Sequence, residues 1–116
     1  MKKILLFAVL ISLISTCCIA GCLSLDYDPQ IDILSLESDD GRMWTAYVQI
    51  TNLNSCPVTA DVKYTLTDTH GNFLGETTQS IGTITESGYK TTQATIRASH
   101  EVDTAYIHVI CTFEMA

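Results

Sequence analysis

The chain has 116 residues, with 13 acidic residues against 6 lysines and arginines and a formal net charge of −7. This length suits one small domain rather than two. The acidic balance disfavours nucleic-acid binding, because such a surface repels phosphate backbones. It equally disfavours electrostatic attachment to anionic lipids.

The N-terminal segment has the order of a secretory signal peptide: two lysines, an apolar run from Ile4, then small residues. Its last four residues are Ile19, Ala20, Gly21 and Cys22. They resemble the lipobox of bacterial and archaeal lipoproteins, in which a branched aliphatic and two small residues precede a cysteine. The resemblance implies a diacylglyceryl group on the Cys22 sulfur and cleavage just before it. Two acyl chains give stable anchoring where one is marginal.

This interpretation divides the chain into a signal peptide (1–21), a lipidated tether (22–30) and a domain (31–116) that faces the exterior or the periplasm. Loss of two lysines with the signal changes the net charge from −7 to −9. Two alternatives stay open: an ordinary signal peptide cut nearby, or a transmembrane helix retained over Ile4 to Leu25, since about 20 apolar residues span a bilayer. In the helix alternative the two lysines still hold the N-terminus inside, so the domain is exported as well.

After the tether, stretches rich in Thr, Val, Ile and Tyr recur about every ten residues, separated by turn residues, which is typical of a sandwich or barrel. The expected strands are 31–37, 42–52, 58–68, 73–84, 89–98 and 105–113. We therefore expect an all-β fold: a small immunoglobulin-like antiparallel β-sandwich of six or seven strands. In the first strand, either Ile31 and Ile33 or Leu34 and Leu36 face the core.

Parts of this pattern resemble the FxLYD-type domain of prokaryotic surface lipoproteins, over about residues 45–97. The matching stretches are Ile50-Thr51-Asn52, Tyr64-Thr65-Leu66-Thr67-Asp68, a glycine turn, Phe73-Leu74, Gly82-Thr83-Ile84 and Gly88. The chain departs from the namesake motif at Tyr64, where the family has phenylalanine, and at Thr67, where it has tyrosine. The resemblance implies an immunoglobulin-like sandwich without catalytic residues.

Two cysteines lie downstream of the anchor, Cys56 before the third strand and Cys111 near the end of the sixth. Strand parity places both at one end of the domain, and an even pair in an exported chain predicts a disulfide. The alternative is two thiols, with Cys111 buried as a small hydrophobe.

The sequence offers no clear metal or catalytic motif. His70, His100 and His108 have no ligand spacing for zinc. Asp26, Asp28, Gln30 and Glu37 match part of a calcium-loop count, but an isoleucine replaces the glycine that the loop needs. No serine or cysteine lies in a nucleophile context. We therefore expect no enzyme, metal site or cofactor.

One surface is a candidate for a partner. The outward face of the last strand carries Tyr106, His108 and Ile110, and the second strand adds Tyr47, which together would form an aromatic patch if nothing covers it. The sequence thus predicts a membrane-anchored, non-catalytic binding or assembly domain that contacts an envelope protein or extracellular polymer. The alternatives are an accessory subunit of an envelope or transport complex and a small surface enzyme.

Overall fold

The computed structural model describes residues 24–116. The predicted signal peptide, Cys22 and the first residue after it lie outside the described residues. All regular structure from residue 24 onward is β-strand, and this part of the chain contains no helix that could span a membrane.

Six strands make up the fold of residues 24–116, close to the predicted positions. They are β1 (Gln30–Glu37), β2 (Met43–Thr51), β3 (Val58–Thr67), β4 (Phe73–Ile84), β5 (Tyr89–Arg97) and β6 (Tyr106–Met115).

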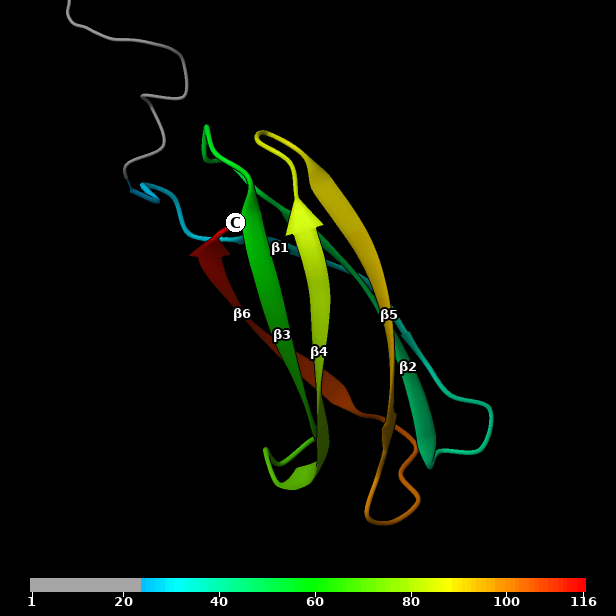
Figure 1. Ribbon diagram of the computed structural model, residues 1–116. Helices are drawn as coiled ribbons and strands as arrows, with labels where there is room; N and C mark the ends of the chain where they lie inside the picture. Colours follow the sequence, from blue (N-terminus) through cyan, green and yellow to red (C-terminus); the bar gives the residue numbers. More distant parts are fainter. Residues whose placement is uncertain (1–23) are drawn as a thin grey trace, which may run out of the picture.

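The strands form two three-stranded sheets, with the orders β1-β2-β5 and β4-β3-β6. Every neighbouring pair is antiparallel. The two sheets face each other as layers of a sandwich (Figure 1). The expected all-β sandwich is therefore confirmed, with six strands in the described part of the chain.

The core lies between the sheets and comes mainly from the alternating faces of the two central strands. β2 contributes Trp44, Ala46, Val48 and Ile50, and β3 contributes Val58, Ala60, Val62, Tyr64 and Leu66, all buried. Between them lie polar residues that are more exposed, as period-2 alternation requires. The alternation of apolar and polar residues that predicted these strands therefore also determines which of their faces is buried.

The first strand contains a bulge that resolves the ambiguity in its sequence. Ile31 pairs with Ile50 and Ile33 with Val48, but the register then shifts so that Leu36 pairs with Ala46. Leu34 is the extra residue, and it changes the phase of the alternation. Ile31 and Leu36 therefore pack against the core, a combination that neither sequence alternative described, whereas Ile33 is 49% exposed.

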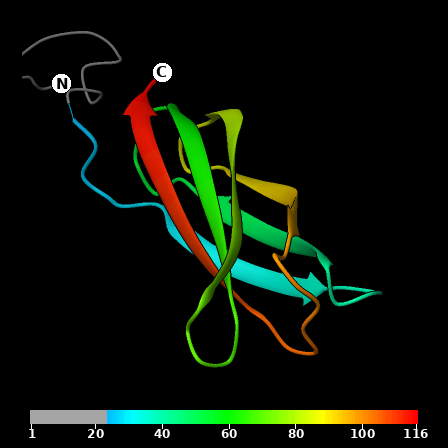
Figure 2. The same ribbon diagram turned by 90° about the horizontal axis from the view of Figure 1, so that it is seen from below.

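The two lateral sides of the sandwich differ. At one side β4 and β5 run next to each other (Figure 1), and two side chains bridge them. At the other side lie β1 and β6 (Figure 2), each hydrogen-bonded to a single neighbouring strand. The inward side chains of β6, namely Ile107, Val109, Cys111 and Phe113, pack against the core but are only partly buried. The sandwich is closed along β4 and β5 and open along β1 and β6.

Candidate functional site

Three of the four residues predicted for the partner face lie together. Tyr106, His108 and Ile110 alternate along the outer face of β6, and Tyr106 and Ile110 are 53% and 61% exposed. His108 Nε2 lies 3.1 Å from the hydroxyl oxygen of Thr67 on β3, which fixes the ring against its own sheet. The three side chains are exposed, which shows that no other element of the described residues covers this face.

The fourth residue, Tyr47, does not belong to this face. It lies on β2, in the other sheet, and pairs with Gln93 of β5. The outer faces of the two sheets of a sandwich point in opposite directions, so Tyr47 is on the far side from β6. The prediction of one patch that includes Tyr47 is wrong because strand parity gives the face of a residue but not the sheet its strand joins.

Phe73 is the aromatic residue of this surface that the sequence analysis missed. It begins β4 and is 60% exposed. Phe73 and Tyr106 both pair with Thr67, from opposite sides, so the two rings flank one position of β3. The sequence shows only that Phe73 and Leu74 point to opposite faces of a strand, and the burial of Leu74 in the structure leaves Phe73 on the outer face.

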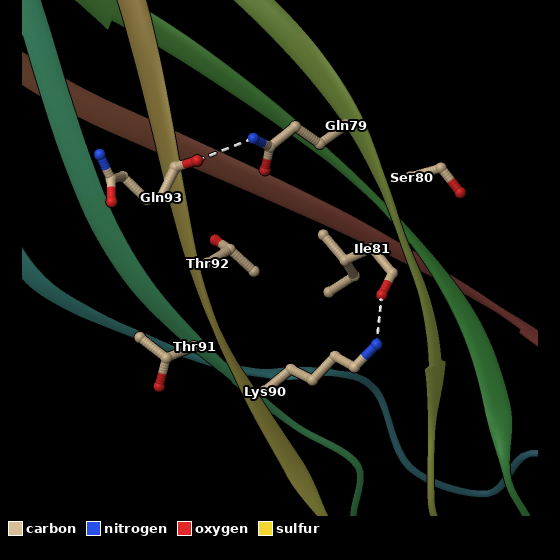
Figure 3. Close-up of a pocket in the computed structure, with 7 residues that line it drawn as sticks. All are labelled: Gln79, Ser80, Ile81, Lys90, Thr91, Thr92 and Gln93. Atoms are coloured by element: carbon tan, nitrogen blue, oxygen red, sulfur yellow. Dashed lines mark hydrogen bonds between the residues drawn. The ribbon is translucent and has the colours of Figure 1, made fainter.

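A polar groove of about 540 Å³ lies between β4 and β5. Its lining residues, drawn in Figure 3, are Gln79, Ser80, Ile81, Lys90, Thr91, Thr92 and Gln93.

The polar groups of this groove are used to close the sandwich. Gln79 Nε2 donates to the Gln93 carbonyl at 2.8 Å, and Lys90 Nζ donates to the Ile81 carbonyl at 2.6 Å (Figure 3). Beneath them the Tyr64 hydroxyl donates to Gln79 Oε1 at 2.9 Å and also bonds the Thr92 hydroxyl. Burial is the main cause that raises the Tyr64 pKa above its ordinary value. The groove holds one charged side chain, already bonded, and no acid–base pair.

The connections at the far end of the sandwich carry several carboxylates. Asp40 accepts hydrogen bonds from the backbone N–H groups of Met43 and Arg42, each at 2.9 Å, and these lower its pKa. Asp68 accepts hydrogen bonds from the backbone N–H groups of Asn72 and His70, which likewise lower its pKa. Each carboxylate therefore stabilises its own turn. Among residues 24–116, no group of three or more potential ligands is placed to hold a metal ion.

The cysteine pair is not bonded to form the predicted disulfide. Cys111 pairs with Val62, whereas Cys56 precedes Val58, the first residue of β3. The four residue steps from Val58 to Val62, the partner of Cys111, span about 13 Å at 3.3 Å per residue, whereas a disulfide allows at most about 7 Å between Cα atoms. Strand parity correctly placed the start of β3 and the end of β6 at the same end of the domain. Cys111, however, lies four residues before the end of β6.

Cys111 lies on the inward side of β6 and is partly buried. Burial, together with the nearby Asp61 carboxylate, raises the pKa of its thiol to about 11. A thiol with such a pKa is almost fully protonated at neutral pH and is a poor nucleophile. The structure therefore gives Cys111 a packing role.

Two buried asparagines form a polar centre at the end of the sandwich where the chain enters. Asn52 and Asn54 are 0% and 2% exposed. Asn52 Nδ2 donates to the Cys56 carbonyl at 2.9 Å and also to the carbonyls of Ile84 and Thr85. These bonds join the β2–β3 connection to the end of β4.

Asn54 holds the incoming N-terminal segment. Its Oδ1 accepts hydrogen bonds from the backbone N–H groups of Asp26 and Tyr27, at 2.8 and 2.9 Å. Its Nδ2 donates to the Tyr27 carbonyl at 3.0 Å. The segment predicted as a tether over residues 22–30 is thus bound to the domain from Asp26 onward. Asn52 ends one of the stretches that resemble the FxLYD-type domain, but nothing in the sequence indicated that the two asparagines bind backbone groups of other segments.

No known protein-family model matches the chain, and no curated protein matches it.

Proposed function

We propose that the chain is an exported lipoprotein, anchored through Cys22, whose sandwich is a non-catalytic domain that binds another envelope protein. The lipobox-like Ile19-Ala20-Gly21-Cys22 supports the anchor, and the FxLYD-type resemblance is consistent with a surface lipoprotein. The absence of a cofactor or catalytic role is part of the proposal. The observation that carries the binding role is the open side of the sandwich along β6.

β6 offers a partner both backbone and side chains. It is an edge strand, hydrogen-bonded to β3 and to no second strand of the described chain, so its outer edge presents free backbone donors and acceptors. Its inward residues are incompletely buried, and Tyr106 and Ile110 are exposed on its outer face. An extended segment of a partner that adds to β6 would satisfy the backbone and cover apolar side chains in one step.

The test is cross-linking in intact cells followed by mass spectrometry, with wild-type chain and two matched variants. Ile110→Glu places a charge on β6, where it repels strand addition. Lys63 is the residue opposite, so the new carboxylate faces an opposite charge and the fold is retained. Thr95→Glu is the control, because Thr95 is exposed on β5 of the other sheet.

We expect one envelope protein to be cross-linked to wild type and to Thr95→Glu, and to be lost from Ile110→Glu. Cross-links that track protein abundance, or that are equal in all three, contradict binding through β6. The mass of the N-terminal peptide from the same cells tests the anchor: it should begin at Cys22 and carry the mass of a diacylglyceryl group. An unmodified Cys22 would contradict the lipoprotein assignment.

A further inference from the structure

We infer that the end of the sandwich around Asn54 lies against the membrane surface, so that the domain stands upright on a bilayer of zwitterionic phospholipid. This inference rests on the proposed anchor at Cys22. It assigns a second membrane contact, made by the folded domain itself.

The chain between the anchor and the fold is short. Asn54 holds the backbone of Asp26 by a hydrogen bond of 2.8 Å, so the domain is fixed from that residue. The four residue steps from Cys22 to Asp26 span at most about 14 Å when fully extended. A strand of ten residues is about 33 Å long. The distance from the anchor to the Asn54 end is therefore shorter than the length of the domain, so the Asn54 end stays close to the lipid.

A set of exposed apolar side chains lies at this same end. It consists of Tyr27, Leu53, Tyr89 and Met115, which are between 42% and 65% exposed.

Each member of the set is placed at this end by an independent contact. Tyr27 is bonded to Asn54, and Leu53 precedes Asn54 in the β2–β3 connection. Tyr89 pairs with Thr51 at the end of β2, and Met115 with Val58 at the start of β3. Tyrosine is enriched at membrane interfaces, because its ring is apolar and its hydroxyl reaches water. The set would thus enter the headgroup region of a bilayer.

Charge selects the kind of lipid. Asp26 lies in the bound segment, Glu86 in the turn before β5 and Glu114 beside Met115, all at the Asn54 end. Carboxylates at the contact oppose an anionic surface. The surface that fits is therefore a zwitterionic one, which accepts the apolar side chains without charge repulsion.

The experiment uses full-length lipoprotein extracted from cell membranes and reconstituted in phosphatidylcholine vesicles, with or without bromine on the acyl chains. Bromine quenches tryptophan emission at short range. Tyr89→Trp reports on the Asn54 end. Tyr106→Trp is the matched control, since both tyrosines are exposed and begin a strand, but Tyr106 pairs with Thr67 at the opposite end. The native Trp44 is present in both variants, and wild type gives its baseline.

We expect about a twofold loss of the added emission in brominated vesicles for Tyr89→Trp and essentially none for Tyr106→Trp, because interfacial contacts reach about 5–10 Å into the bilayer. Leu53→Trp provides a second reporter at the Asn54 end and should behave like Tyr89→Trp. Equal quenching at both ends would mean a domain lying flat, and no quenching at either would mean a domain held off the surface. Either result overturns the inference.

Flotation separates this inference from the anchor. Suppose that the wild-type chain floats with the vesicles and that the Cys22→Ser variant does not. The anchor is then supported, and an unquenched Tyr89→Trp would show that only the orientation is wrong. If the wild-type chain does not float, the anchor fails and the orientation fails with it.

Discussion

Asn52 Oδ1 accepts two hydrogen bonds from Asn54, one from its backbone N–H at 2.9 Å and one from its Nδ2 at 3.0 Å. Through this pair, a single polar centre connects the N-terminal segment, the β2–β3 connection and the end of β4. Buried amides are retained only when their donors and acceptors are matched. Here both side chains meet that condition, and they fix where the chain joins the domain.

Replacement of Asn54 by alanine tests this centre. We expect Asn54→Ala to lower the free energy of unfolding by about 2–4 kcal/mol. The part-buried N–H groups of Asp26 and Tyr27 lose their acceptor, and Asn52 Oδ1 keeps only the hydrogen bond from the residue 54 backbone. Native-state hydrogen exchange should speed up most at the amides of Asp26 and Tyr27, which bond to Asn54 directly. Unchanged exchange at these two amides would show that the segment is held by something else.

A second prediction concerns Tyr64, whose hydroxyl bridges to the β4–β5 side. We expect Tyr64→Phe to cost about 1–2 kcal/mol of unfolding free energy in a urea titration, because Gln79 and Thr92 each lose a partner. Tyr106→Phe is the control and should be neutral, since Tyr106 is exposed. Equal stability of Tyr64→Phe and wild type would mean that water replaces the hydroxyl at no cost.

Reducing agent should leave the melting temperature unchanged to within about 1 °C, because Cys56 and Cys111 are not bonded to each other. A disulfide closing a loop of this size would contribute about 4 kcal/mol. Since each kcal/mol is worth about 4–8 °C in a domain of this size, its reduction would lower the melting temperature by 15 °C or more. A thermal melt with and without reductant decides between the two.

The Cys111 thiol should be slow to alkylate. Its pKa of about 11, against a reference of 9.0, reduces the thiolate fraction at pH 8 by about 100-fold. Peptide mass spectrometry after timed iodoacetamide treatment should therefore give a rate for Cys111 about two orders of magnitude below its own rate in denaturant. Comparable rates in the two conditions would contradict the burial of this side chain.

Acid should weaken the turn at Asp68. The backbone N–H groups of Asn72 and His70 lower the pKa of Asp68 below its ordinary value of 3.8. The stability that the carboxylate contributes is therefore present above pH 3.8 and is lost as the pH falls through the folded-state pKa. The difference in unfolding free energy between wild type and Asp68→Asn should be largest near neutral pH and shrink in acid. A difference that does not change with pH would contradict this role for the carboxylate.

The sequence predicted what depends on local alternation. The strands around Val48 and Val62 follow from period-2 patterning because antiparallel sheets bury one face. Non-local pairing was out of reach: nothing near Tyr47 indicates that β2 joins β5 while β3 joins β6. The bulge at Leu34 changes the phase within one strand, which no single alternation can represent.

The sequence was least able to predict contacts between residues that depend on the exact register of the strands. The Cys56–Cys111 bond required an exact position along β6, and an offset of four residues removes it. The roles of Asn52 and Asn54 depend on backbone groups from three distant segments, which leave no pattern of their own in the sequence. By contrast, the exposed positions of Tyr106 and Ile110 followed directly from parity on one strand.

The attachment at Asn54 also decides how a pull on the N-terminal side would pass into the fold. Tension would first load the hydrogen bonds that hold Asp26 and Tyr27, then enter β1 at Gln30 along the strand axis. The ladder between β1 and β2 runs perpendicular to the strands, so its bonds would resist sliding together rather than open one after another. Under tension, the hydrogen bonds of Asn54 to the N-terminal segment would therefore break before the ladder between β1 and β2.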